Sequence, residues 1–181
     1  MEWLVQFFQL LTAWIPRFKF ILPNEAGVRI TAGKKVKEIG PGWWFYWPLV
    51  HDLLWCTVVS QVVDIAPQSL RTKDAKNLTI SLTMRYSIPD ARMALLNVHS
   101  YDQALQNLTR GVAAEYFNQH TLAECWDIAT MADQAKQMVQ KAARGWGVKI
   151  EELYVDEITE AISVRLMSRG ESAKGSSDVQ L

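Results

Sequence analysis

The 181-residue sequence contains few of the residues that define specialised classes of protein. It has only two cysteines, Cys56 and Cys125, which excludes a small secreted scaffold held by disulfides and fits a reducing compartment. Nine glycines and six prolines are too few for a collagen-like or low-complexity chain. Neither sign of charge is in excess, since 19 basic side chains balance 19 acidic ones. Without clustered lysine and arginine, we expect no nucleic-acid partner.

Motifs for catalysis and metal binding are also missing. His51, His99 and His120 lie far apart, and none has a cysteine at metal-ligand spacing. Two carboxylate pairs, Glu151/Glu152 and Asp156/Glu157, fall on a predicted strand, where adjacent side chains point to opposite faces. The sequence therefore predicts no enzyme, no cofactor and no metal. A Ser/His/Asp set assembled from distant residues is the alternative that sequence does not exclude, because such triads are recognised by geometry.

The sequence is richest in aromatic residues near its amino terminus, where six of the eight tryptophans lie within the first 55 residues. Residues 3–15 contain ten apolar side chains and no charge. On a helix, Gln6, Gln9 and Thr12 form a narrow polar stripe. The broad apolar face opposite is the predicted membrane-binding surface, made by Trp3, Leu4, Phe7, Phe8, Leu11, Trp14 and Ile15.

This apolar segment is short for a membrane span, because 13 residues of helix reach roughly 20 Å against a hydrocarbon core of ~30 Å. We expect a helix that lies in the interface or dips into the bilayer, with Trp3 and Trp14 at headgroup level. The alternative is a buried first helix of a soluble domain. Basic residues downstream predict that the remainder lies on the cytoplasmic side, namely Arg17, Lys19, Arg29, Lys34, Lys35 and Lys37.

Short β segments follow the amino-terminal region. Val28–Thr31 and Val36–Ile39 flank a turn sequence and predict a hairpin. Leu53–Ile65 is rich in β-branched residues and predicts one central strand. Apolar and polar residues alternate from Leu78 to Ile88, which predicts a strand with one buried face.

Helices are predicted after Pro89. Ser100 begins a capping box, and an apolar face at helical spacing runs from Tyr101 to Phe117. Thr121 begins a second capping box, before a helix that continues through Met131 and ends at Gly145. Val148–Val155 returns to strand with a change of phase that predicts a bulge. This β, α, β order predicts an α+β fold.

The order of several motifs resembles the SPFH (band 7) family, which includes stomatins, prohibitins, flotillins and the bacterial HflK/HflC proteins. The resemblance runs from about Asn24 to Thr159. Five segments carry it: residues 24–28, Gly40-Pro41-Gly42 with residues 43–52, Thr72-Lys73-Asp74 with residues 77–80, residues 86–91, and Trp146-Gly147-Val148 with residues 149–150. The resemblance implies an SPFH-like domain, mostly an antiparallel sheet with packed helices.

What the resemblance implies about function is a membrane-anchored, non-catalytic scaffold. Its copies would assemble side by side, organise membrane microdomains and regulate membrane proteins. We expect residues 1–22 to be the anchoring segment, 23–160 the SPFH domain, and 161–181 a short helical extension and polar tail. The alternative is a regulatory partner, or a mimic of a longer relative, that binds a membrane protein or an ATP-dependent membrane protease without large self-assembly. Cross-linking in membranes distinguishes a ladder of self-adducts from one foreign adduct.

Five consecutive aromatics predict a second membrane contact in a projecting loop at residues 42–50. Alternation would send Trp43, Phe45 and Trp47 to one face and Trp44 and Tyr46 to the other. Tryptophan and tyrosine favour the membrane interface, so the predicted contact residues include Trp43, Trp44, Phe45 and Trp47. The alternative is that the domain covers both faces and these aromatics belong to its core.

Overall fold

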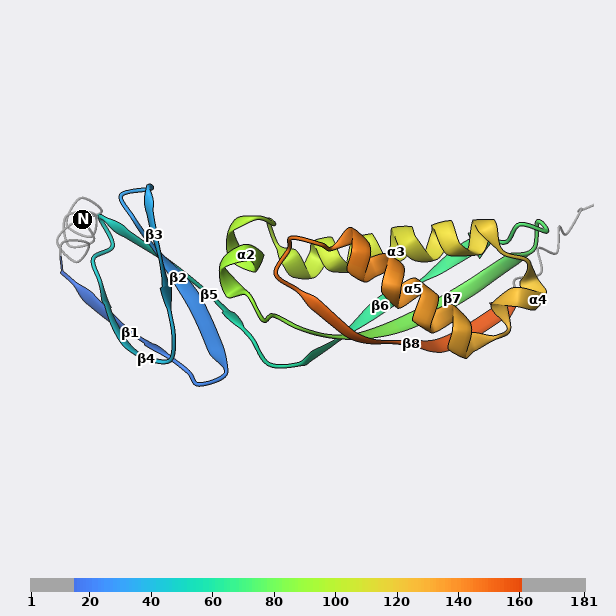
Figure 1. The fold of residues 1–181 in the computed structure, drawn as a ribbon, viewed down its shortest axis with the longest axis horizontal. Coiled ribbons are helices and arrows are strands. Elements are labelled where there is room, and N and C mark those ends of the chain that lie inside the picture. Colours follow the sequence, from blue (N-terminus) through green and yellow to red (C-terminus); the bar gives the residue numbers. More distant parts are fainter. Residues whose placement is uncertain (1–14, 161–181) are drawn as a thin grey trace, which may run out of the picture.

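The computed structural model describes residues 15–160, which form an elongated molecule with two parts (Figure 1). At one end, five short strands form two small sheets, which we name the β module (residues 17–57). At the other end, a three-stranded sheet and its helices form the αβ module (residues 61–160). Every strand pair is antiparallel. The predicted α+β fold with mostly antiparallel sheet is therefore confirmed for this part of the chain.

The β module contains a two-stranded and a three-stranded sheet. In the first sheet, β1 (Arg17–Ile21) pairs with β4 (Gly42–Tyr46). In the second, β2 (Glu25–Thr31) lies between β3 (Lys35–Ile39) and β5 (His51–Thr57). The predicted hairpin is confirmed as β2–β3, and positive φ angles at Ala32 and Gly33 give its turn the twist that hairpins require.

The two small sheets stack on each other. Ile21 of β1 and Ile39 of β3 lie on the facing sides and are buried between the layers. The opposite side of the three-stranded sheet carries Val28 and Cys56, also buried, and meets helix α2 (Ala91–Leu96). The β module is thus layered as sheet, sheet and helix, and α2 joins it to the rest of the molecule (Figure 1).

The predicted single strand over Leu53–Ile65 is wrong. The chain leaves the β module after β5 and enters a different sheet as β6 (Gln61–Arg71). Val58 lies at the crossing, where its N–H donates to the Asn24 carbonyl at 2.9 Å and its carbonyl accepts from the Ile88 N–H at 3.2 Å. β-branched residues favour extended backbone on both sides of this crossing, so propensity does not reveal the break.

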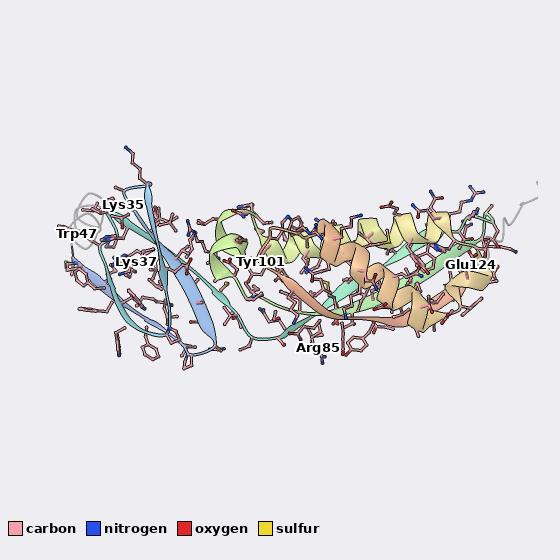
Figure 2. All side chains as sticks on the ribbon, viewed as in Figure 1. Lys35, Lys37, Trp47, Arg85, Tyr101 and Glu124 are labelled. Carbon is pink, nitrogen blue, oxygen red and sulfur yellow. The ribbon has the colours of Figure 1, made fainter. Side chains whose placement is uncertain are left out.

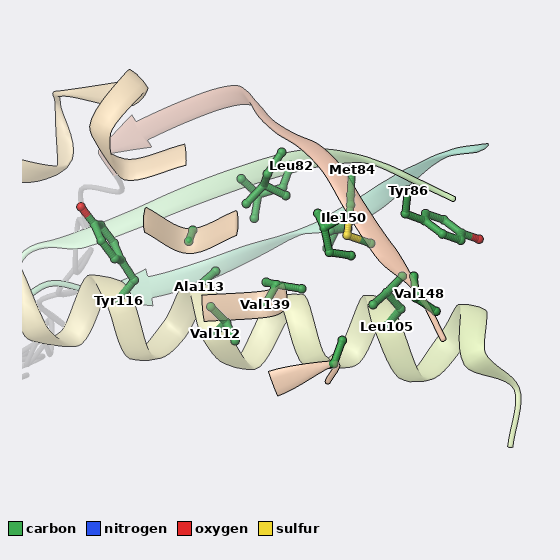
Figure 3. Packing of buried hydrophobic residues seen from close by; sticks show 14 of the residues in the cluster. Leu82, Met84, Tyr86, Leu105, Val112, Ala113, Tyr116, Val139, Val148 and Ile150 are labelled. Atoms are coloured by element: carbon green, nitrogen blue, oxygen red, sulfur yellow. The ribbon is translucent and has the colours of Figure 1, made fainter. Parts of the chain in front are cut away.

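In the αβ module, β7 (Asn77–Ser87) is the central strand, between β6 and β8 (Lys149–Glu160). Its apolar residues are buried in strict alternation from Leu78 to Tyr86, as predicted. They face α3 (Tyr101–Gln119) and α5 (Ile128–Ala142), which lie along one side of the sheet (Figure 1). Figure 3 shows this core, with strand residues Leu82 and Met84 above Leu105 and Val112 of α3.

The predicted helix starts are confirmed at one site and wrong at another. Ser100 precedes α3 but has φ 50° and makes no side-chain cap bond, so the first capping box does not form. The Thr121 capping box forms with both of its hydrogen bonds, although it caps a four-residue helix, α4 (Leu122–Cys125). α5 begins separately, where Asp127 accepts a hydrogen bond from the Thr130 N–H, and it ends at Ala142 rather than Gly145.

Strand β8 contains the predicted bulge and is longer than predicted. Its register against β7 shifts twice, so Glu151 and Asp156 are each an extra residue without a direct partner. The strand continues to Glu160, the last residue of the predicted SPFH domain. The predicted helical extension and tail at residues 161–181 lie outside the described residues.

Candidate membrane-contact site

Four aromatic side chains cover one side of the β1–β4 sheet, and we name this surface the aromatic face. Strand register places Phe18 directly opposite Phe45 and Phe20 opposite Trp43. The ring centroids are 5.4 Å apart in the first pair and 5.2 Å in the second. Such cross-strand aromatic pairs stabilise an antiparallel sheet, which explains how the two short strands hold together.

The aromatic face is open to solvent. Trp43 is 74% exposed and Phe18 is 68% exposed, while Phe20 and Phe45 are each nearly half exposed. Further large apolar side chains are exposed in the segments that adjoin β1 and β4 in the sequence, at Ile15, Leu22, Trp47, Leu49 and Val50. Isolated exposed apolar residues are ordinary, but contiguous apolar patches on a small domain mark sites that contact a protein or a membrane.

The alternation predicted for residues 43–47 is found within β4. Trp43 and Phe45 are exposed, whereas Trp44 and Tyr46 are half-buried on the side that faces the second sheet. The prediction of a projecting loop over residues 42–50 is wrong for its first half, because residues 42–46 pair with β1. Only residues 47–50 form a turn, in which the Val50 and His51 N–H groups donate to the Trp47 carbonyl.

Phe18 and Phe20 complete this surface but were absent from the predicted contact residues. The signal for them is the alternation of charge and ring in Arg17-Phe18-Lys19-Phe20, which indicates a strand with one aromatic side. Of the residues predicted at the amino terminus, Ile15 is described and exposed. The others lie outside the described residues, namely Trp3, Leu4, Phe7, Phe8, Leu11 and Trp14.

Charge is distributed unevenly between the two modules. Residues 15–57 carry six basic and three acidic side chains, whereas residues 58–160 carry ten basic and thirteen acidic ones. Figure 2 shows Lys35, Lys37 and Trp47 together at the β-module end, with Arg85 and Glu124 on the αβ module. The aromatic face therefore belongs to the more basic half of the molecule.

The αβ module carries an ion-pair cluster where sequence alone predicted separated carboxylates. Arg85 contacts Glu151 through Nε at 3.3 Å and Glu152 through Nη2 at 2.9 Å. Both glutamates reach one arginine because the bulge places two residues opposite one, so the prediction that they point to opposite faces is wrong. The Ser60 hydroxyl donates to Glu151, and this bond, with help from Arg85, holds the pKa of Glu151 below its usual range. The cluster ties β8 to the chain crossing between the modules.

The described residues contain no group of histidine, cysteine or carboxylate side chains arranged to hold a metal ion. Cys56 and Cys125 are free thiols, and burial raises the pKa of each to about 11. Thiols of that pKa are mostly protonated at neutral pH and are poor nucleophiles.

Two of the motifs that carry the family resemblance have structural roles. The buried Thr72 hydroxyl donates to Asp74 and accepts from the Lys76 N–H, which closes the β6–β7 turn. Asp74 also accepts from the Leu122 N–H at the start of α4. The Thr72 hydrogen bond is the main reason that the pKa of Asp74 is lowered. Gly147 lies against Asp90 at the start of α2, where the Asp90 N–H donates to its carbonyl.

Across residues 15–160, none of the helices combines the length and the apolar character that a membrane crossing needs.

Comparison with known proteins finds one family and several relatives whose names agree with it. Residues 19–171 match the SPFH domain / Band 7 family. A putative band 7 family protein of Acanthamoeba polyphaga mimivirus is 22% identical over 142 residues, which cover 78% of this chain and 47% of that protein. Stomatin of Mus musculus is 23% identical over 120 residues, covering 66% of this chain and 42% of stomatin. Stomatin-2 of Caenorhabditis elegans is 22% identical over 120 residues, covering 66% of this chain and 32% of that relative.

The chain spans about half the length, or less, of these three relatives. The family match begins within β1 and runs through β8, so it includes both modules and the aromatic face except Phe18. The resemblance inferred from the order of short motifs is thereby confirmed, and the chain belongs to the SPFH domain / Band 7 family.

Proposed function

We propose that this protein is a non-catalytic membrane scaffold whose β module contacts the bilayer surface through the aromatic face. The observation that carries the proposal is the pairing of Phe18 with Phe45 and of Phe20 with Trp43 on a solvent-exposed sheet surface. The ring pairs stabilise the sheet, but a contiguous exposed apolar surface of this kind marks a contact site, and tryptophan and phenylalanine are typical of surfaces that lie in the membrane interface.

The proposed scaffold role follows from membership of the SPFH domain / Band 7 family and goes beyond it. Copies would associate side by side on the membrane, organise microdomains and regulate membrane proteins, with the segment 1–22 as a further anchor. Association through the strand edges is disfavoured, because both outer strands of the large sheet carry bulges, and β6 also contains Pro67 in its bulge. Contacts between copies would instead use the faces of the modules.

Vesicle binding tests the membrane contact. The variant Phe18→Thr/Trp43→Thr removes one exposed ring from each strand and keeps residues that favour β structure. These rings expose on the order of 300 Å², so even half-burial in the bilayer predicts a loss of about a hundredfold in affinity for phosphatidylcholine vesicles. The matched control is Trp126→Thr, because Trp126 is 52% exposed on the αβ module.

The test uses both the full chain and a chain that begins at Ile15, which retains every described strand and helix but lacks residues 1–14 of the proposed anchor. We expect the double variant of the shorter chain to lose vesicle binding while its circular dichroism spectrum is unchanged, and the control to bind like the parent. If the folded double variant binds as well as the parent, the aromatic face is not a membrane contact.

A further inference from the structure

Three basic side chains lie on the facing sides of the two sheets of the β module, and we name them the cationic cluster: Lys19, Arg29 and Lys37. Lys19 and Arg29 are half-buried, and Lys37 is exposed at the edge strand β3. Lys19 of β1 lies over the ring of Trp55, with Nζ 4.0 Å from the ring centroid. Lys37 of β3 lies 5.8 Å from the ring centroid of Trp44. Arg29 of β2 donates from Nη1 to the Phe45 carbonyl at 3.3 Å. Each contact joins one sheet to the other.

Strand pairing places members of the cluster beside one another within each sheet. Arg29 and Lys37 are direct cross-strand partners, and Lys19 is the partner of Trp44. Directly opposed side chains have Cβ atoms about 5 Å apart, and like charges in that arrangement destabilise a sheet. The Arg29–Lys37 pair is therefore unfavourable unless an anion lies near it.

No carboxylate within residues 15–160 forms an ion pair with Lys19, Arg29 or Lys37. Glu38 and Asp52 are on the other side of the three-stranded sheet, opposite Val28 and Ile30. Glu25 shares the side of Arg29 but accepts the Leu22 N–H at the far end of β2. The Arg29 Nε is buried and has no hydrogen-bond partner.

The cluster lies on the reverse side of the strand pair that carries the aromatic face. Stacked sheets are about 10 Å apart, and the headgroup layer of one leaflet is roughly 5–8 Å thick. With Phe18 and Trp43 at the hydrocarbon boundary, Lys19 would therefore lie at the depth of the lipid phosphates. The rings of Trp44 and Trp55 hold the two lysines in place and favour the same interfacial zone.

From these observations we infer that the cationic cluster binds the phosphate of an anionic lipid headgroup. The inference rests on the proposed membrane contact and adds a lipid preference to it. Arginine and lysine supply charge-assisted donors to phosphate oxygens, and an anion between Arg29 and Lys37 relieves their repulsion.

The test compares two variants of the full chain that lose the same charge. Arg29→Gln/Lys37→Gln removes two members of the cluster, and Lys34→Gln/Lys35→Gln removes two exposed lysines at the β2–β3 turn. Binding is measured to phosphatidylcholine vesicles and to phosphatidylcholine vesicles that contain phosphatidic acid. Loss of any charge near an anionic surface weakens binding by about fivefold, so both variants lose that much per residue.

We expect the cluster variant to lose a further factor of about ten on the phosphatidic acid vesicles, from lost charge-assisted hydrogen bonds. An equal loss in the two variants overturns the inference and leaves only general electrostatic attraction. Binding to pure phosphatidylcholine reports on the apolar contacts of the aromatic face and the amino-terminal segment, and Phe18→Thr/Trp43→Thr removes the first of these, so failure of the proposed function is recognised separately. If glycerol 3-phosphate in solution shifts the Trp44 and Trp55 indole NMR signals and abolishes the lipid preference, the site is for a soluble phosphate.

Folding of the cluster variant is checked by thermal unfolding without lipid. Relief of the Arg29–Lys37 repulsion offsets part of the loss of the Arg29–Phe45 hydrogen bond and the Lys37–Trp44 contact, so we expect a folded variant that melts within a few degrees of the parent. Lys37→Met is a second variant, which keeps the chain length over Trp44 and loses one charge. If Lys37→Met keeps the full preference for phosphatidic acid, the inference is wrong.

Discussion

Gly147 offers a sharp test of how the two modules are joined. Its φ is +69°, and a Cβ at this position would lie 2.3 Å from the Asp90 carbonyl oxygen and 2.9 Å from the Ala94 nitrogen. Both atoms belong to the start of α2, the helix that packs on β2 and β5. Gly147→Ala must therefore displace α2 as well as strain its own backbone.

Gly145 is the matched control, because its φ is +87° and a Cβ there meets nothing within 4 Å. An alanine in the left-handed region costs about 1–2 kcal/mol, so Gly145→Ala is expected to lower the free energy of unfolding by about that amount. Gly147→Ala adds about 1–3 kcal/mol for overpacking, giving a total loss of about 2–5 kcal/mol. The difference between the variants isolates the contact with α2.

Urea unfolding of the full chain, followed by circular dichroism, measures both variants. We expect Gly147→Ala to unfold at a clearly lower urea concentration than Gly145→Ala, and to melt lower by about 2–4 °C for each additional kcal/mol. If the two alanine variants are equally stable, α2 does not approach Gly147 as described, and the Trp146-Gly147-Val148 motif needs a different explanation.

Two further predictions concern titratable groups. Because hydrogen bonding lowers the pKa of folded Glu151 below its ordinary 4.5, its contribution to stability is present above that value and lost as pH falls through the folded pKa. The stability difference between the parent and Glu151→Gln should therefore shrink on acidification, and a difference independent of pH in urea titrations would contradict this. The thiols of Cys56 and Cys125, with pKa values of about 11, should resist iodoacetamide in the folded chain at about pH 8 and react in denaturant. Rapid labelling of the native protein, measured by mass spectrometry, would show that they are accessible.

Much of the local structure was predictable because its cause lies within a few residues. The alternation from Leu78 to Ile88 identified β7, since only a strand places every second residue on one side. The turn sequence at residues 32–35 identified the β2–β3 hairpin. The Thr121 capping box was predictable for the same reason, because its hydrogen bonds join residues three positions apart.

Failures occurred where the deciding contact lies far along the chain. The strand predicted over Leu53–Ile65 breaks because Val58 bonds to Asn24 and Ile88, which belong to other parts of the fold. Ser100 has the sequence of a cap but a left-handed backbone, so its side chain makes no cap bond. The bulge in β8 was predicted, but the convergence of Glu151 and Glu152 on Arg85 depends on its register against β7.

The candidate membrane-contact site also has features that the sequence predicts and features that only the tertiary structure decides. The sequence by itself determined that residues 43–47 alternate between two sides of a strand and that aromatics concentrate near the amino terminus. Only the tertiary structure decided which side is open, because β1 must pair with β4 to set Phe18 and Phe20 beside Phe45 and Trp43. The cationic cluster depends in addition on the stacking of the two sheets, because its contacts join residues of one sheet to residues of the other. Side chains distant in sequence become neighbours through backbone pairing and layer packing, and neither is encoded in the spacing of residues along one segment.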